Sequence, residues 1–332
     1  MNNFKTVMLI VFASVFYQCD AFFLQIGDWD SPKQVDLDMI TTHKQPRSNP
    51  TQEIHQLLLE GPSGLQVPCT FFNRQSDTML IVGCPLPAPK EAMELFATLF
   101  DTYDVVLFDY QWSGCFGSML TKAIVTARPI QKILFDQIAV VERVLSFAQE
   151  RKQYTKIVGL GECYSAFFFA KIQADAIKKT GTGPFTHLIF DSCWHSIRSF
   201  AEQICVDPFL PINPKKGGAP RLLTMLTNST IFKKTVLRLA FAMLQNVSIE
   251  PYISSVKTPL LFIHGLNDLF VTKAHFDTIW DAADPHNRAV LYTPYGHCDN
   301  LHKKDVYRSV CNTFINAASI KELQNLPILI DA

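Results

Sequence analysis

Three short segments carry side chains suited to nucleophilic attack on an acyl carbon. The first reads G-E-C-Y-S and centres a thiol, Cys163, between a strand-like apolar run and a helix-like one. The second places Asp268 after the run P-L-L-F-I-H-G, and the third places His297 within Y-G-H-C. A thiolate can attack, an imidazole can carry the proton and a carboxylate can orient the imidazole. Cys163, Asp268 and His297 are therefore the candidate catalytic residues, in that order along the chain.

The elements that must position these residues alternate between strands and helices. Apolar runs bounded by turn residues predict strands at 56–60, 65–72, 78–83, 104–109, 156–160, 187–191, 259–264 and 289–293. Helical periodicity falls at 90–100, 129–150, 165–179, 273–283 and 304–318. This alternation predicts an α/β protein with a mostly parallel sheet covered by helices on both faces, and the first two strands suit an antiparallel edge hairpin.

The turn at Cys163 is the most specific of the three signals. A strand-to-helix turn of the form G-x-nucleophile-x-small holds its central residue in strained backbone geometry and lifts that side chain clear of the sheet. Gly161 and Ser165 are small enough for the strand and the helix to approach closely. The sequence therefore predicts a nucleophile elbow.

Over residues 56–320 the chain resembles the α/β-hydrolase superfamily. Four segments carry the resemblance: the elbow, F-D-Y-Q-W-S-G-C-F-G-S after the fourth strand, P-L-L-F-I-H-G-L-N-D-L-F-V-T at the seventh, and T-P-Y-G-H-C-D-N at the end of the eighth. The segment D-S-C-W-H-S-I-R-S-F-A after the sixth strand is similar to the start of the cap in membrane-associated esterases of that superfamily. The resemblance implies an eight-stranded sheet, a helical cap inserted after strand 6 at about 192–256, and the nucleophile-acid-histidine order found above. Cysteine replaces the commoner serine, as it does in dienelactone hydrolases.

The resemblance also implies an oxyanion hole built from two backbone N–H groups. One is that of Tyr164, the residue after the nucleophile, and the other comes from the loop after the third strand. That loop contains Pro85 and Leu86. Proline has no N–H, so Pro85 at the donor position would cost about 10²–10³ in rate, whereas Leu86 would restore the donor if the loop shifts by one residue.

Other interpretations of these residues stay open at this stage. Cys163 could be a small buried hydrophobe in a hydrolase that has lost its nucleophile. Asp191 is the substitute acid, His302 the substitute histidine, and His264 suits packing. The segment 159–164 weakly matches a dinucleotide-binding fingerprint, although its third glycine is replaced and it does not open the first strand-helix-strand unit.

Composition and charge restrict the class of protein and its partners. The 332 residues are 48% hydrophobic, enough to bury a large core, and 30 Lys and Arg balance 30 Asp and Glu. A net charge of zero favours neither nucleic acid nor an anionic membrane. Nine cysteines without a C-x-x-C pair, together with histidines that do not cluster, argue against zinc and iron-sulfur sites, so we expect neither metal nor cofactor.

The N-terminus predicts export. Lys5 precedes an apolar run at 7–17 that is too short to span the roughly 30 Å of a hydrocarbon core, which is typical of a signal peptide at 1–21. Acylation of Cys19, an uncleaved anchor and a cytoplasmic location are the alternatives. A loosely ordered lead-in follows at 22–55, then the hydrolase domain at 56–320 and a C-terminal tail at 321–332.

These features together predict an acyl hydrolase of the carboxylesterase or thioesterase type. Its substrate would be a small or lipid-like acyl compound held under the cap, where the apolar run 235–244 suits either an acyl pocket or packing on the core. A lipid-like substrate would bring the protein to a membrane surface. The competing hypothesis is a pseudo-hydrolase that binds a ligand or partner through the old pocket. The sequence does not specify the oligomeric state.

Overall fold

The computed structural model describes residues 53–85, 88–110, 130–196 and 247–317. The strands in these ranges are β1 (Glu53–Glu60), β2 (Gln66–Asn73), β3 (Thr78–Gly83), β4 (Asp104–Phe108), β5 (Lys156–Glu162), β6 (His187–Asp191), β7 (Leu260–Gly265) and β8 (Arg288–Thr293). The α-helices are α2 (Glu94–Leu99), α4 (Ile130–Arg151), α5 (Ser165–Thr180), α10 (Glu250–Ile253), α11 (Lys273–Ala282) and α12 (Lys304–Asn316). Short 3-10 turns lie at Pro62–Gly64, Lys90–Met93 and Asn300–Lys303. Every predicted strand overlaps an observed one.

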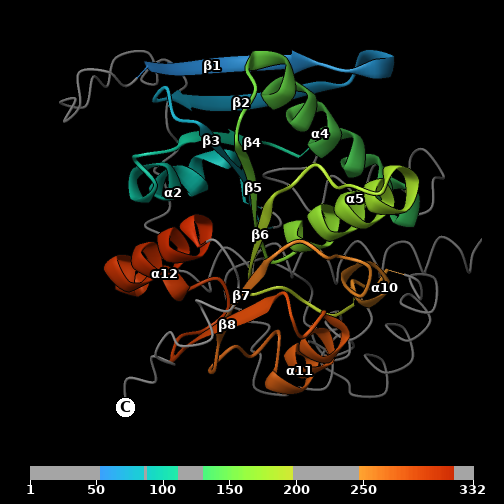
Figure 1. The fold of residues 1–332 in the computed structure, drawn as a ribbon, viewed down its shortest axis with the longest axis vertical. Coiled ribbons are helices and arrows are strands. Elements are labelled where there is room, and N and C mark those ends of the chain that lie inside the picture. Colours follow the sequence, from blue (N-terminus) through green and yellow to red (C-terminus); the bar gives the residue numbers. More distant parts are fainter. Residues whose placement is uncertain (1–52, 86–87, 111–129, 197–246, 318–332) are drawn as a thin grey trace, which may run out of the picture.

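The strands form one sheet in the order β1-β2-β4-β3-β5-β6-β7-β8 (Figure 1). Strand β2 runs antiparallel to both of its neighbours, and the remaining pairs, from β4 through β3 to β8, are parallel. The predicted eight-stranded, mostly parallel sheet with an antiparallel edge hairpin is therefore confirmed.

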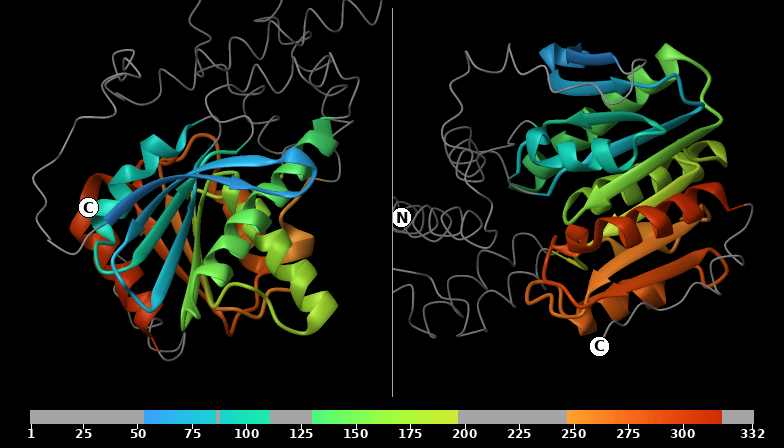
Figure 2. Two further views of the ribbon diagram at one scale, coloured as in Figure 1. Left: turned by 90° about the horizontal axis from the view of Figure 1, so that it is seen from above. Right: turned by 90° about the vertical axis from the view of Figure 1, so that its left-hand side faces the viewer.

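Helices cover both faces of this sheet. Figure 1 shows α2 and α12 on one side and α4, α5, α10 and α11 on the other, and the left view of Figure 2 shows the same layers from above. The side chains of β3, β4 and β7 are almost all buried, as expected for parallel strands with helices on both faces. The first half of helix α5 is buried on nearly all sides, and its Phe167, Phe168 and Phe169 are at most 1% exposed. It is the central helix that carries the elbow.

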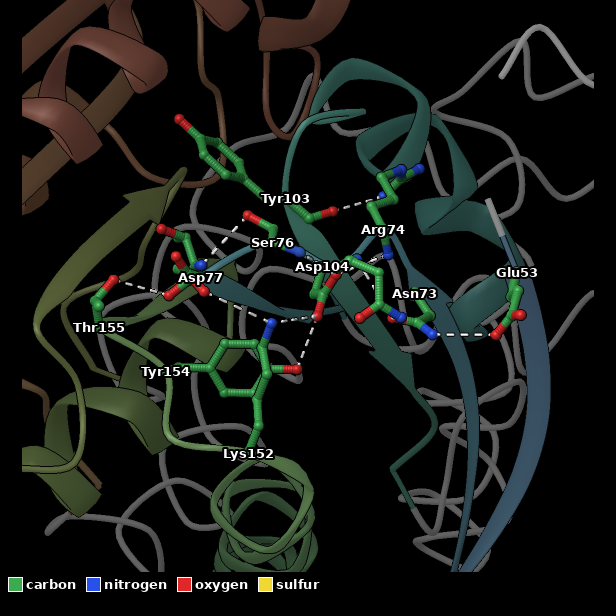
Figure 3. A network of polar contacts seen from close by, with 12 residues as sticks. Glu53, Asn73, Arg74, Ser76, Asp77, Tyr103, Asp104, Lys152, Tyr154 and Thr155 are labelled. Carbon is green, nitrogen blue, oxygen red and sulfur yellow. Dashed lines mark hydrogen bonds and ion pairs between the residues drawn. The ribbon is translucent and has the colours of Figure 1, made fainter. Parts of the chain in front are cut away.

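A polar network lies at the amino ends of the central strands (Figure 3). The carboxylate of Asp104, at the start of β4, is 1% exposed. It accepts hydrogen bonds from the backbone N–H groups of Arg74 and Ser76, at 2.7 and 3.1 Å, and from the hydroxyl of Tyr154 at 2.9 Å. Lys152 lies 3.8 Å away as an ion-pair partner. The network joins the β2–β3 turn and the α4–β5 turn to the start of β4.

The two described ends of the predicted cap insertion come together. Ser196 and Ser248 form an antiparallel bridge, and the N–H of Ile249 donates to the carbonyl of His195 at 3.0 Å. The chain therefore leaves the sheet after β6 and, at Ser248 and Ile249, lies again beside the place where it left.

Several sequence predictions fall outside the described residues. These are the signal peptide at 1–21, residues 22–52 of the lead-in, the centre of the insertion at 197–246 with the apolar run 235–244, and the tail at 321–332. Among the residues that the structure does describe, no helix combines the length and the apolarity needed to cross a bilayer.

Candidate active site

The candidate residues lie where the central parallel strands end. Cys163 follows β5, Asp268 lies in the loop after β7 and His297 lies in the loop after β8. Carboxyl ends of neighbouring parallel strands meet at one edge of a sheet, which is where open α/β sheets bind ligands. Asp191, at the end of β6, lies at the same edge.

Cys163 occupies a strained backbone conformation, as the elbow motif predicts. Its φ is +53°, which L-residues other than glycine rarely adopt. Its N–H is held by the carbonyl of Asp191 at 2.8 Å. A Cβ on Gly161 would lie 2.7 Å from the backbone nitrogen of Ala166, so only glycine lets β5 and α5 approach this closely. The turn therefore presents the thiol at the end of β5.

A second close approach ties the loop after β3 to the elbow. A Cβ on Gly83 would lie 2.7 Å from the Cβ of Ser165. The Ser165 hydroxyl donates to the carbonyl of Cys84 at 2.5 Å and accepts from the hydroxyl of Tyr110 at 2.9 Å. The small residue two positions after the nucleophile thus fixes the start of α5 against the end of β3.

The three candidate catalytic side chains form one hydrogen-bonded series. The Nε2 atom of His297 lies 3.2 Å from the sulfur of Cys163, and its Nδ1 atom lies 2.7 Å from Oδ2 of Asp268. The other carboxylate oxygen of Asp268 accepts from the N–H groups of Phe270 and Val271, at 2.8 and 2.7 Å. Asp268 is fully buried, His297 is 7% exposed at its side chain, and Cys163 is 6% exposed. The imidazole is therefore held between the acid and the thiol.

The acid loop and the histidine loop are joined directly. The N–H of Leu266 donates to the carbonyl of Thr293 at 2.7 Å, and the N–H of Asn267 donates to that of Tyr295 at 3.1 Å. A Cβ on Gly265 would lie well inside 3.0 Å of the Tyr295 carbonyl oxygen. The absence of a side chain at this glycine lets the two loops close on each other.

The charges around the thiol favour the thiolate. A hydrogen bond from the Cys298 thiol and the positive charge of His297 lower the pKa of Cys163 to about 5, against the opposing effect of burial. For His297, burial disfavours the imidazolium, but the Asp268 carboxylate and the Cys163 sulfur outweigh it and raise the pKa well above its usual value. Both shifts favour a thiolate-imidazolium pair over a neutral thiol and imidazole.

Cys298 is the residue of the candidate site that sequence reasoning missed. Its thiol lies against Cys163, its N–H donates to the hydroxyl of Ser192 at 3.0 Å, and its φ is +56°. The available signal was a cysteine directly after the candidate histidine. Nothing in the spacing along the chain shows that residue 298 returns to residue 163.

Glu162, the residue before Cys163, is buried. Its side chain points into the protein and is 2% exposed. Burial, followed by the charges of Asp191 and Cys163, raises the pKa of Glu162 well above its usual value. This shift favours the uncharged form of the carboxyl group, which does not repel a thiolate.

Asp191, the substitute acid, is bound to other partners. It accepts from the Ser192 hydroxyl at 2.9 Å, from the Asn300 amide at 2.5 Å and from the Tyr307 hydroxyl at 3.0 Å. Burial raises its pKa to about 6 against these hydrogen bonds. Its contacts anchor the segment that follows His297 to the end of β6.

His302, the substitute histidine, and His264, assigned to packing, both contact groups other than the Cys163 thiol. His302 is exposed and pairs with Asp299 at 3.0 Å. His264 is buried and stacks on Phe276 with ring centroids 4.5 Å apart, in line with the packing role predicted for it. Burial lowers the pKa of His264 to about 4, so its ring is neutral.

The predicted oxyanion donors are described only in part. Tyr164 directly follows Cys163 and is the N-cap residue of α5. Pro85 is buried, and its carbonyl accepts from the N–H of Ala88 at 2.8 Å. Without an N–H, Pro85 cannot act as an oxyanion donor. Leu86 lies outside the described residues, and its role stays a prediction.

Aromatic rings surround the residue after the nucleophile. The ring of Tyr164 stacks on Trp194, with ring centroids 5.1 Å apart, and meets Phe168 edge-on, with ring centroids 4.6 Å apart. The ring centroid of Phe167 lies 6.1 Å from that of Trp194 and 5.7 Å from that of Tyr252. Trp194 and Tyr252 come from the two described ends of the insertion, so apolar surface joins the insertion to the elbow.

Three of the site's side chains could also hold a metal. Within the described part of the chain, the sulfur atoms of Cys163 and Cys298 and a ring nitrogen of His297 all lie within 4.8 Å of one another. The prediction of a metal-free protein relied on spacing along the chain, which does not show this grouping.

No disulfide forms among the cysteines that the structure describes, which are Cys69, Cys84, Cys163, Cys193, Cys298 and Cys311.

Comparison with known proteins identifies the fold. No family model matches the sequence, and no curated protein matches it either. Among solved structures, the Pyrococcus furiosus esterase Pf2001 is similar with a TM-score of 0.58 at 12% identity, covering 82% of this chain and 92% of that one. Acetyl xylan esterase 1 from Thermoanaerobacterium gives 0.54 at 10% identity, with 80% and 84% covered. A 2,6-dihydroxy-pseudo-oxynicotine hydrolase gives 0.54 at 14% identity, with 81% and 69% covered. The chain has the α/β-hydrolase fold.

Proposed function

We propose that this chain, on its α/β-hydrolase scaffold, is an acyl hydrolase that cleaves esters or thioesters through an acyl-enzyme on Cys163. The observation that carries the proposal is the unbroken series from the Cys163 sulfur, at a positive φ, through His297 to Asp268. Residues from three separate loops meet at hydrogen-bonding distance in the order that nucleophilic catalysis requires. The esterases and the hydrolase among the similar structures support the same reaction class.

The reaction proceeds in two halves. The Cys163 thiolate attacks the acyl carbon, and the carbonyl electron pair moves onto oxygen. When the tetrahedral intermediate collapses, the bond to the alcohol or thiol breaks, and that group takes the Nε2 proton of His297. Neutral His297 then removes a proton from water as the water attacks the thioester. Collapse of the second intermediate releases the acid and restores the thiolate, while Asp268 holds the imidazole in one orientation throughout.

In this mechanism the backbone N–H groups of Tyr164 and Leu86 are the two oxyanion donors.

The surroundings of the thiol support an apolar acyl group. The rings of Tyr164, Phe167 and Trp194 form an aromatic cluster beside the elbow, which favours an apolar or aromatic acyl chain over a charged one.

The test is hydrolysis of a panel of p-nitrophenyl esters and acyl thioesters of increasing chain length by the full-length chain. Turnover should be lost in Cys163→Ala and His297→Ala. The turnover that remains in Cys163→Ser should show how far a hydroxyl can replace the thiolate. Cys311→Ala, which changes a buried thiol on α12, is the matched control and should retain activity. Rapid quenching should trap the acyl mass on the peptide that contains Cys163. Turnover indifferent to Cys163→Ala would disprove the thiol mechanism.

A pseudo-hydrolase is the second candidate, and Pro85 is the observation that favours it. The residue immediately after Cys84 in the oxyanion loop offers no N–H. If no ester or thioester is turned over and Cys163 is acylated by p-nitrophenyl acetate only at the rate of a free thiol, the site does not assist acyl transfer, and the pseudo-hydrolase is favoured.

A further inference from the structure

The cluster formed by Cys163, His297 and Cys298 has the donor atoms of a metal site. Two sulfurs and one imidazole nitrogen converge from the elbow and from the loop after β8. This Cys₂His set is one that binds zinc in proteins while leaving a fourth position open to water. Thiolate and imidazole together select Zn²⁺ and its soft relatives over Mg²⁺ or Ca²⁺.

The distances fit tetrahedral coordination with little movement. Zinc bonds of about 2.3 Å to sulfur and about 2.0–2.1 Å to nitrogen place tetrahedral ligand atoms roughly 3.4–3.8 Å apart. Here the sulfur of Cys163 and Nε2 of His297 are 3.2 Å apart, and all three donor atoms lie within 4.8 Å of one another. Shifts of the donor atoms by a few tenths of an ångström to about one ångström would bring them to these tetrahedral distances.

The surroundings already hold these ligands as metal ligands are usually held. Metal-binding histidines almost always donate their second ring nitrogen to a carboxylate or carbonyl. The Nδ1 atom of His297 lies 2.7 Å from Asp268, which is itself fixed by two backbone N–H groups. Cys298 is fixed through its own backbone, because its N–H donates to Ser192 at 3.0 Å. The site therefore combines a carboxylate-histidine pair with two positioned thiols.

We propose that Zn²⁺ binds reversibly across Cys163, His297 and Cys298, with water as the fourth ligand. Binding displaces the proton on Nε2 of His297 and the thiol proton of Cys298, and the lone pairs so freed bind the metal with the Cys163 thiolate. The nucleophile and its base are then both engaged, so the metal blocks acyl transfer. The blocking of turnover rests on the proposed function, whereas binding of the metal does not.

The first test uses metal-free full-length chain kept reduced by a non-thiol reductant. Addition of Co²⁺, a spectroscopic substitute for Zn²⁺, should produce the visible bands of tetrahedral cobalt and a sulfur-to-cobalt charge-transfer band, and one equivalent of Zn²⁺ should abolish both. Cys298→Ala and Cys163→Ala should each weaken the charge-transfer band. Asp268→Asn should weaken Zn²⁺ binding in equilibrium dialysis by about 10–100-fold, the usual effect of removing such a carboxylate. Cys311→Ala is the control and should bind like the parent.

A second measurement identifies the residue without relying on variants that fail to fold. Zn²⁺ should slow iodoacetamide labelling of the peptide containing Cys163, read by mass spectrometry, and a chelator should restore the rate. Zn²⁺ that binds but leaves labelling of Cys163 unchanged would overturn the inference, as would cobalt bands that persist in both cysteine variants.

The outcomes separate this inference from the proposed function. If no substrate is turned over but the cobalt bands and the protection of Cys163 appear, the metal site stands alone. If substrates are turned over and Zn²⁺ neither protects Cys163 nor inhibits, the metal site is wrong and the hydrolase remains. Where both hold, the inhibition constant for Zn²⁺ should equal the dissociation constant from dialysis.

Discussion

At the scale of single residues, the second cysteine distinguishes this site from a plain Cys-His-Asp arrangement. Cys298 follows His297 directly, and its positive φ turns the backbone so that neighbouring side chains can both reach Cys163. The same thiol contributes to the low pKa of the nucleophile and to the donor set of the metal cluster. One short loop thus places both an imidazole and a thiol against the sulfur of Cys163.

Removing the Cys298 thiol should make Cys163 harder to ionise. The Cys298 hydrogen bond is the largest influence on a pKa that lies at about 5, below the ordinary value of 9.0. The thiolate is therefore present above about pH 5 and is lost as the pH falls through that value. In Cys298→Ala the midpoint should move upward, so labelling of Cys163 by iodoacetamide should require a higher pH. The measurement is the labelling rate from pH 3.5 to 9.

Cys311→Ala serves as the comparison for this experiment, because it removes a buried thiol on α12 rather than one beside the nucleophile. Its labelling midpoint should match that of the parent. An unchanged midpoint in Cys298→Ala would mean that His297 alone sets the pKa of the nucleophile.

At the scale of elements, two close approaches of backbone hold the site together. The first, at Gly161, lets α5 begin directly at the end of β5. The second, at Gly265, lets the loop that carries Asp268 lie against the loop that carries His297. Strand pairing already places the end of β7 beside the end of β8, with Gly265 opposite Thr293, and the second approach keeps the loops that follow them in contact.

Gly265→Ala should separate the acid from the histidine. The new Cβ would meet the backbone carbonyls of Tyr295 and Gly296, which cannot rotate away as a side chain would. Displacement by about 1 Å typically costs about 10²-fold in rate, so we expect kcat/KM to fall by that order while the protein remains folded. Gly296→Ala is the matched control, since its Cβ would have no atom within 4 Å. Equal losses in the two variants would show that general loop disturbance is responsible.

The sequence predicted these elements well because each one carries its own local pattern. Buried parallel strands such as β4 and β7 are continuous apolar runs, and all eight strands overlapped their predicted ranges. The elbow was legible because G-x-C-x-S has a steric purpose at a single turn. Cys298 could not be predicted, since its contact with Cys163 depends on how the loops after β5 and β8 fold toward each other. The inward direction of Glu162 was equally hidden, because alternation along a strand does not say which face the last residue takes at a sharp turn.

At the scale of the whole molecule, the two ends of the sheet have different roles. The carboxyl ends of β5, β7 and β8 carry the candidate catalytic groups on strained or tightly joined loops. The amino ends carry the hydrogen-bonded network around Asp104, which joins turns from distant parts of the chain (Figure 3). Stability and reactivity should therefore respond to different substitutions.

Asp104→Ala should destabilise the protein without altering the thiol. The variant leaves the backbone N–H groups of Arg74 and Ser76 and the hydroxyl of Tyr154 without their acceptor. Removing one partner of a buried ionic network costs about 3–5 kcal/mol, so urea unfolding should shift by that order. Asp77→Ala is the matched control, because its carboxylate also faces Lys152, at 3.9 Å, but is 82% exposed at the side chain and should change stability by no more than about 0.5 kcal/mol. Under native conditions, iodoacetamide should label Cys163 in both variants at the rate seen in the parent protein. Slower labelling in Asp104→Ala, measured where it is still folded, would show that strain at the amino ends reaches the elbow through β5.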